Sequence, residues 1–261
     1  MSRFNRMLIA AFVGSLSAPV FGLTNFEDFS TNSDGRWEQL NNRVAGQDYG
    51  YSNTNNVFGL GNGEMGGLIL RSGAPANFYA FNVGSLDPVS EAFSASGFLK
   101  VTEPDGGSGY YLGFFKRDAG AVPDGFYGSG GDPHGFMGIG FGDMHHAQAF
   151  LFSQSGGRDR SGVDPSTGIG TLVPWSIVWT PGGGMVCTIN GVPQGPVTPG
   201  DGAASLGVMD HFGIFATSAN GADGRAFLDD TTFTSDNPLP EPASLSLLAV
   251  GGVGLIRRRR A

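Results

Sequence analysis

The sequence predicts an all-β protein whose strands form a two-sheet antiparallel sandwich. The chain has 261 residues with 45 glycines, 15 prolines and only 15% charged residues, a composition that favours short strands and tight turns over helices. Its 21 phenylalanines and three tryptophans supply large apolar side chains for a core. About a dozen short apolar segments, separated by turn residues, run through the middle of the chain, as in sandwich domains.

The first 22 residues are predicted to be a secretory signal peptide. Arg3 and Arg6 form a basic start, an apolar run begins at Met7, and small residues lead to a cleavage position after Gly22. The alternative is a buried first helix of the fold. A second export feature at the other end of the chain favours the signal peptide.

The body of the chain shows the two-residue alternation of half-buried strands. Its segments 30–65 and 153–170 are rich in polar residues and glycine and are predicted to be loops. The predicted strands are 25–29, 66–71, 77–82, 97–101, 110–117, 135–141, 148–152, 175–180, 185–189, 211–216 and 225–234.

The clearest hairpin joins strands 175–180 and 185–189 through a glycine-rich turn. Trp175 and Trp179 share one face of the first strand, since side chains alternate along a strand, and we expect both in the core. Asn190-Gly191 follows the second strand and predicts another tight turn with positive φ.

One strand alternates large residues with glycine. Phe136, Gly138 and Gly140 share one of its faces, and Met137 and Ile139 share the other. We expect the glycine face to lie where two sheets approach closely, with room for a covering loop or a ligand as the alternative.

The only cysteine is Cys187, so no intramolecular disulfide can form. It lies in an apolar strand, where a buried, unreactive thiol is expected.

The body, residues 23–234, resembles a concanavalin A-like (laminin G-like) jelly roll. The resemblance rests on 175–191, with its tryptophan strand and Asn-Gly turn, and on the segments 212–215 and 227–233. It implies that the last strand pairs with the first, here 26–29. Secreted proteins of this fold include glycan binders, Ca²⁺ binders and polysaccharide hydrolases.

The charge of the body is strongly acidic. Six of the 15 basic residues and one of the 23 acidic residues lie in the two end segments, so residues 23–239 keep nine basic and 22 acidic residues, a net charge of −13. Nucleic acid binding requires a basic surface, so we expect no nucleic acid partner.

The C-terminal segment 240–261 follows a short linker at 235–239. Its apolar run 243–256 would rise about 21 Å as a helix, shorter than the roughly 30 Å hydrocarbon core of a bilayer, so we expect transient membrane insertion only. The basic end would stay on the cytoplasmic side. The residues that define the segment are Pro240, Glu241, Pro242, Arg257, Arg258, Arg259 and Arg260.

This order of Pro-Glu-Pro, apolar run and arginine cluster resembles the PEP-CTERM protein-sorting signal of bacterial exported proteins. The resemblance implies recognition by a membrane-embedded exosortase together with the export machinery. It also implies cleavage near Pro-Glu-Pro and delivery to the cell surface or extracellular matrix. The alternative is a disordered hydrophobic C-terminus.

The sequence contains no recognisable catalytic arrangement, and we expect a protein that is not an enzyme. Retaining glycosidases need two carboxyl groups about 5–5.5 Å apart. Glucanases of the concanavalin A-like fold place them as Glu-x-Asp-x-x-Glu on one strand, and no such pattern occurs. No Gly-x-Ser-x-Gly nucleophile motif occurs either.

Candidate binding residues fall into two groups. Sugars are bound by aromatic platforms flanked by polar groups, and the tyrosines in loops or at strand ends are the candidates: Tyr49, Tyr51, Tyr110 and Tyr127. We expect no required cofactor, but Ca²⁺ suits carboxylate ligands. If the terminal strands pair, a calcium site is expected at Glu27, Asp28, Asp229 and Asp230; alternatively, these carboxylates face solvent or cap turns.

These observations predict an exported, non-catalytic protein of the cell surface or extracellular matrix, with a sandwich domain that binds glycan or extracellular polysaccharide. A carbohydrate-active enzyme of the same fold is the first alternative, and a purely structural matrix component is the second.

Overall fold

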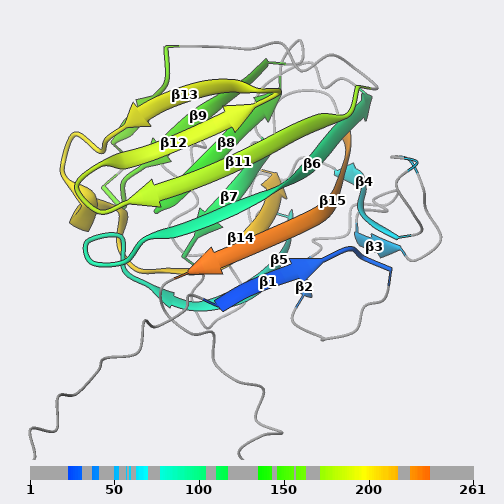
Figure 1. The fold of residues 1–261 in the computed structure, drawn as a ribbon, viewed down its shortest axis with the longest axis horizontal. Coiled ribbons are helices and arrows are strands. Elements are labelled where there is room, and N and C mark those ends of the chain that lie inside the picture. Colours follow the sequence, from blue (N-terminus) through cyan, green and yellow to red (C-terminus); the bar gives the residue numbers. More distant parts are fainter. Residues whose placement is uncertain are drawn as a thin grey trace, which may run out of the picture.

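The computed structural model describes residues 23–30, 37–40, 50–52, 57, 59, 63–69, 77–103, 110–116, 135–142, 146–155, 157–162, 171–216 and 224–235. They form a sandwich of two antiparallel sheets (Figure 1). This architecture confirms the predicted all-β jelly roll. The predicted signal peptide, the sorting segment and all of the linker except Ser235 lie outside the described residues.

The eight-stranded sheet lies in front in Figure 1. Seven of its strands follow one another across the sheet, and β1 pairs with β15 beside that path. In this order the strands are β13 (Val192–Val197), β12 (Gly184–Ile189), β11 (Val173–Thr180), β6 (Phe93–Glu103), β15 (Gly224–Ser235), β4 (Glu64–Ile69) and β3 (Gly50–Ser52), with β1 (Leu23–Glu27).

The seven-stranded sheet lies behind it (Figure 1). A short 3₁₀ helix, η2 (Ala203–Leu206), precedes β14 in the chain. Across the sheet the strands are β10 (Arg158–Arg160), β9 (His146–Phe152), β8 (Phe136–Gly142), β7 (Tyr110–Phe115), β14 (Met209–Ala216), β5 (Asn77–Leu86) and β2 (Trp37–Leu40).

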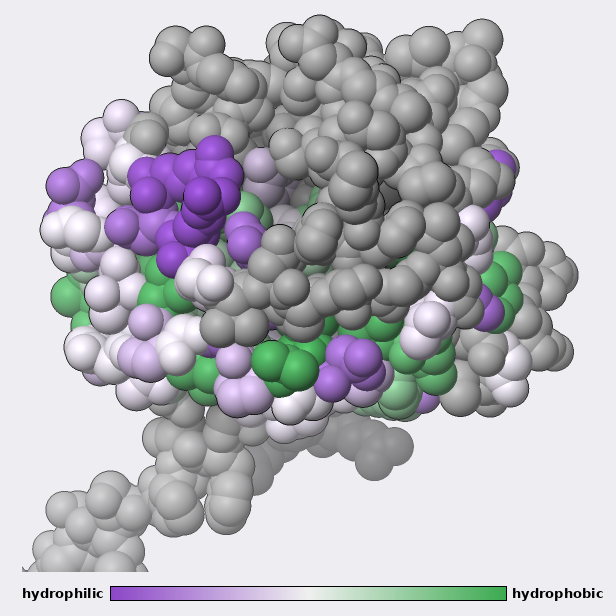
Figure 2. Space-filling model, turned by 90° about the horizontal axis from the view of Figure 1, so that it is seen from above, coloured by the Kyte–Doolittle hydropathy of each residue, from purple (hydrophilic) through white to green (hydrophobic). Residues whose placement is uncertain are grey.

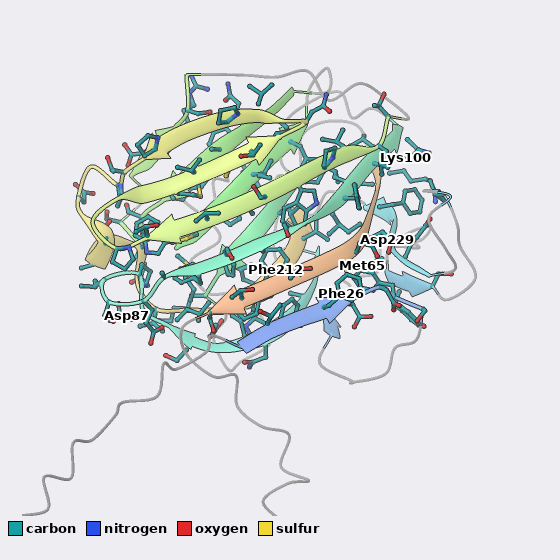
Figure 3. All side chains as sticks on the ribbon, viewed as in Figure 1. Phe26, Met65, Asp87, Lys100, Phe212 and Asp229 are labelled. Atoms are coloured by element: carbon teal, nitrogen blue, oxygen red, sulfur yellow. The ribbon has the colours of Figure 1, made fainter. Side chains whose placement is uncertain are left out.

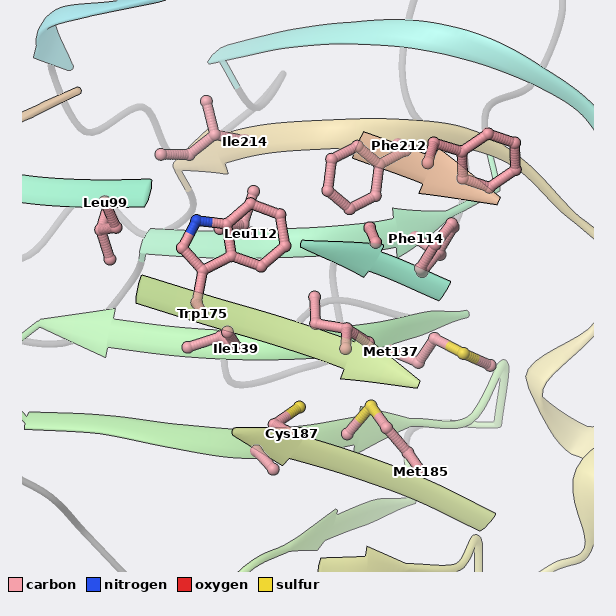
Figure 4. Close-up of a cluster of buried hydrophobic side chains, with 14 of the residues drawn as sticks. Leu99, Leu112, Phe114, Met137, Ile139, Trp175, Met185, Cys187, Phe212 and Ile214 are labelled. Atoms are coloured by element: carbon pink, nitrogen blue, oxygen red, sulfur yellow. The ribbon is translucent and has the colours of Figure 1, made fainter. Parts of the chain in front are cut away.

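The core lies between the two sheets and is built from one face of β4 to β9 and of β11 to β15 (Figure 4). In β11, every second residue from Val173 to Trp179 is buried, as the alternation predicts. Phe114 of β7 and Phe212 of β14 pack with ring centroids 4.9 Å apart, and Trp175 of the opposite sheet stacks on Phe212 at 6.0 Å. Such dense aromatic packing stabilises a chain that has no disulfide.

The last strand, β15, pairs with the first strand, β1. β15 pairs with β1 along its second half, and Phe26 lies opposite Thr232. The expected pairing of last and first strands is therefore confirmed. The predicted tight turn is also present, since Asn190 and Gly191 have φ of 51° and 77°.

Four short strands were not predicted: β2, β3, β10 and β13. The first three lie in segments expected to be loops, and β13 carries two prolines and a glycine in six residues. β3, β10, β13 and β2 are the end strands of the two sheet paths. Edge strands are short and tolerate proline because one side needs no hydrogen-bond donor, so their sequences show little strand pattern.

Within the described ranges, we find no helix with the length and apolar character needed to span a bilayer.

Candidate functional site

Buried carboxylates gather where three strands of the eight-stranded sheet meet. The first half of β15 pairs with β4 and its second half pairs with β1. β1 ends at Glu27 and β4 begins at Glu64, so both carboxylates lie beside the middle of β15. There β15 bulges, and Asp230 takes a left-handed φ of 47°. Figure 3 shows Asp229 at this position, near Met65 of β4.

Two of the buried carboxylates and the neighbouring exposed Asp28 cap their own turns. Glu27 Oε1 accepts the Phe29 N–H at 2.9 Å, and Asp28 Oδ1 accepts the Ser30 N–H at 2.9 Å. Asp229 Oδ1 accepts the Asp230 N–H at 2.8 Å. Such local hydrogen bonds favour the turn that ends β1 and the bulge of β15.

The negative charge of Asp229 is disfavoured by its burial and by the neighbouring carboxylates. Burial, together with the charges of Asp230, Glu64 and Asp28, raises the pKa of Asp229 from 3.8 to about 6. Hydrogen bonds from Ser30 instead lower the pKa of Asp28, which lies at the surface. A cation near Asp229 would therefore relieve a real electrostatic cost.

Glu27, Asp229 and Asp230 lie on adjacent strands and Asp28 directly follows β1, but their role as calcium ligands stays a prediction. Among the described residues, no group of three or more His, Cys, Asp or Glu side chains is arranged to hold a metal ion. One further oxygen fits a cation: Thr231 Oγ1 is buried opposite Glu27 and has no hydrogen-bond partner in the described part of the chain. Sequence reasoning missed Glu64, because only the pairing of β4 with β15 brings it to Asp229.

A second aromatic cluster covers the outer face of the seven-stranded sheet. Tyr111 contacts three phenylalanine rings, with centroids at 5.3 Å for Phe136, 5.6 Å for Phe152 and 6.2 Å for Phe150. Their strand neighbours face the main core, so these rings point away from it. We call this cluster the outer aromatic layer: Ala80, Tyr111, Phe115, Phe136, Phe150 and Phe152.

The glycine face of β8 belongs to this layer, which corrects the expectation of a close approach between the sheets. A Cβ at Gly140 would lie 2.6 Å from the Phe150 ring. A Cβ at Gly138 would lie 2.2 Å from the Leu112 carbonyl oxygen and 2.9 Å from the Phe136 ring. Gly140 therefore makes room for an aromatic ring of the layer, and Gly138 for the neighbouring strand as well as a ring.

Cationic and polar groups border the outer aromatic layer. The Arg158 guanidinium lies 5.2 Å from the Phe150 centroid, a cation–π distance. His211 stacks on Phe115 at 5.7 Å, and its Nδ1 lies 2.7 Å from Asp210 Oδ1. All six members of the layer are at most 9% exposed, so in this structure the layer is a second core rather than an open platform.

The predicted tyrosines do not form one site among the described residues. Tyr51 lies in β3, is half-buried and packs against the main core. Tyr110 begins β7 in the other sheet, opposite Phe141. Tyr49 and Tyr127 lie outside the described residues. A ligand role for the four stays a prediction.

The cysteine is buried as expected. Cys187 has no exposed surface, and burial raises the pKa of its thiol far above the ordinary value. Its Sγ lies 3.8 Å from the Gly138 carbonyl of the opposite sheet. A thiol in this position cannot reach a substrate in solution.

The described surface carries no large continuous apolar patch in the view of Figure 2. Hydrophilic residues gather on one side, and hydrophobic residues appear in small groups between polar ones. Within the described chain, the large apolar side chains that are exposed are Phe26, Val89, Val178, Val192 and Val208.

Comparison with known proteins supports two separate features. Residues 238–260 match the family model of the PEP-CTERM protein-sorting motif. No curated protein is similar enough in sequence to match the chain.

Solved structures match the body of the chain. Peanut lectin with a 9mer peptide is 14% identical, with a TM-score of 0.55 over 82% of this chain and 97% of the lectin. Cellulose-induced protein Cip1 is 11% identical, with a TM-score of 0.53 over 80% and 96%. Lectin UEA-II complexed with galactose is 11% identical, with a TM-score of 0.52 over 82% and 98%. The chain therefore joins a concanavalin A-like, legume-lectin-like jelly roll to a PEP-CTERM protein-sorting motif, which implies export and sorting to the cell surface.

Proposed function

We propose that this protein is a non-catalytic, exported component of the cell surface or extracellular matrix that binds glycan or extracellular polysaccharide. The single observation that carries the proposal is the joining of a lectin-like jelly roll to a PEP-CTERM motif in one chain. The motif supports delivery to the outside of the cell. Lectin UEA-II, whose structure contains galactose, supports sugar as the ligand class.

Exosortase is the proposed partner in sorting. It would recognise Pro240, Glu241 and Pro242 while the apolar run 243–256 sits transiently in the membrane. Cell fractionation of the wild-type chain and of a variant with these three residues changed to alanine tests this step. We expect the variant to stay with the membrane and to keep its C-terminus, as read by mass spectrometry. Identical fractionation and processing of the two chains would refute the sorting role.

Glycan binding is tested with the exported protein on a glycan array, with and without Ca²⁺. Binding to defined glycans would support the proposal. Absence of binding in both conditions, in a correctly exported protein that also fails to bind insoluble polysaccharide, would contradict it and favour a purely structural matrix component. Release of reducing sugars from a bound polysaccharide would instead favour the enzyme alternative.

Calcium is the proposed ion at the carboxylates beside the bulge of β15. The buried Asp229 and the buried hydroxyl of Thr231 support it, because the ion would offset the charge of the carboxylate and give the hydroxyl oxygen a partner. An ion that binds only the folded protein raises its melting temperature. We expect Ca²⁺ to raise the melting temperature of the wild type and to raise that of Asp229→Asn less. Equal shifts would place the ion elsewhere.

A further inference from the structure

The outer face of the eight-stranded sheet carries side chains in an ordered arrangement. The strands β15, β6, β11 and β12 each present alternate residues there, because the residues between them face the core. Thr24 and Phe26 of β1 are exposed beside them. The pairing registers align these outward residues into rows that cross all five strands. The sequence does not predict these rows, because they join residues that are far apart in the chain, from position 24 to position 234.

The first row consists of one aromatic and four hydroxyl residues. The pairing runs from Thr188 to Ser176, then to Ser96, Thr232 and Phe26. The hydroxyl side chains are half-exposed, and Phe26 at the end of the row is 58% exposed. Figure 3 shows Phe26 on β1, at the front of the molecule.

The second row is parallel to the first. It runs from Val186 to Val178, then to Ser94, Thr234 and Thr24. The Thr234 and Thr24 hydroxyls lie 3.2 Å apart, which places both side chains on the same face. Val178 is 43% exposed although it lies on an interior strand of the sheet. We call the two rows together the hydroxyl array.

The hydroxyl array is an uncharged area on an acidic protein. Seven of its ten side chains carry a hydroxyl, three are apolar, and none is charged. The body around it has a net charge of −13, from nine basic and 22 acidic residues in 23–239. An uncharged area on an acidic protein suits an uncharged partner, since polyanions would be repelled by the body.

The dimensions of the array suit a polymer. Neighbouring strands lie about 4.8 Å apart, so five strands span about 19 Å, and the two rows are separated by about 6.8 Å. This length exceeds one sugar ring. Hydroxyls both donate and accept hydrogen bonds, and interleaved apolar groups contact the C–H faces of sugar rings. A second copy of the chain is disfavoured, because it would bring two bodies of charge −13 together.

We propose that the hydroxyl array is the docking surface for an uncharged, insoluble polysaccharide. This inference rests on the proposed glycan-binding function and specifies the ligand class and the face that contacts it. The outer face of one sheet then holds the polymer by many weak contacts, and no deep pocket is required.

The test is depletion of the exported protein from solution by microcrystalline cellulose and insoluble chitin, with alginate gel as the polyanionic comparison. Val178→Lys places a charge in the middle of the array, and Val208→Lys is the matched control because Val208 has a similar exposure, 41%, outside the array. We expect binding by the wild type and by Val208→Lys. Val178→Lys should bind about tenfold more weakly, since its ammonium must be desolvated against the polymer. Near-UV circular dichroism checks that both variants are folded.

Phe26→Ala is a second variant that leaves the interior strands intact. It removes the most exposed ring of the array and should also weaken binding, with no change in the secondary structure. If Val178→Lys is misfolded, this variant decides the outcome.

Other results overturn the proposal. Equal binding by Val178→Lys and wild type, both folded, removes the array as the docking face and leaves glycan binding itself intact. If the wild type binds neither insoluble polymer but binds glycans on the array, the hydroxyl array is likewise excluded as the docking face and glycan binding stands. Failure in both assays overturns the proposed function as well. Conversion of a wild-type dimer into a monomer by Val178→Lys would show that the array is an interface between copies.

Discussion

Asp229 offers the sharpest test of the electrostatics at the bulge of β15. In the wild type, the Asp230 N–H donates to Asp229 Oδ1 at 2.8 Å. The substitution Asp229→Asn removes the charge and keeps an amide oxygen that can accept this hydrogen bond. It also keeps the size of a side chain that is only 3% exposed. The change therefore isolates the cost of a buried carboxylate from the packing around it.

The expected magnitude follows from the pKa of Asp229. Burial, then the nearby charges of Asp230, Glu64 and Asp28, raise this pKa from 3.8 to about 6. A rise of about two units corresponds to about 3 kcal/mol between the two protonation states. Because the folded protein holds this proton more tightly than the unfolded chain, the stabilisation is complete below about pH 4 and is lost as the pH rises through 6.

Urea unfolding in EDTA between pH 4 and pH 8 measures the difference. We expect Asp229→Asn to raise the free energy of unfolding at pH 7 by at most about 3 kcal/mol and to have almost no effect at pH 4. Asp201→Asn, an exposed carboxylate away from β15, should leave the profile unchanged. Lower stability of Asp229→Asn at pH 7, or a difference that does not change with pH, would refute the reasoning.

Three further predictions concern packing. Gly113→Ala should destabilise the fold by several kcal/mol, because its Cβ would lie 2.2 Å from the Met137 carbonyl oxygen; Gly162→Ala, with open space around it, should cost little, and equal urea midpoints would contradict this. Gln194→Leu should cost about 3 kcal/mol or more, since the buried amide accepts from the Ala149 N–H and the Ser161 hydroxyl, whereas exposed Gln154→Leu should be nearly neutral in the same thermal unfolding assay. The thiol of Cys187 should react with a thiol reagent only after denaturation; rapid labelling of the native protein would show that the strand is not buried as described.

Much of the fold was predictable because the alternation of apolar and polar residues along a strand depends only on residues that are close in the sequence. The buried face of β11 and the turn at Asn190-Gly191 follow from residues that are neighbours in the chain. The alternation of β8 also follows from its sequence, but both of its faces carry phenylalanine, Phe136 on one and Phe141 on the other. Alternation alone could not decide which face meets the opposite sheet, and the expected orientation of Phe136 and its glycines was wrong.

The candidate sites depended more on tertiary structure. The sequence predicted that Glu27 and Asp28 would lie near Asp229, because the resemblance to a jelly roll implied pairing of the terminal strands. Glu64 joins them only because β4 and β1 share one edge of β15.

The fold class, the core faces of the clearest strands and the sorting motif can be predicted without a structure, because contiguous residues encode each of them. The surroundings of Asp229, the outward aromatic layer and the hydroxyl array become apparent only in the folded chain. The physical reason is that sheet registers join residues far apart in the chain, such as Thr24 and Thr234, and no local pattern records those registers.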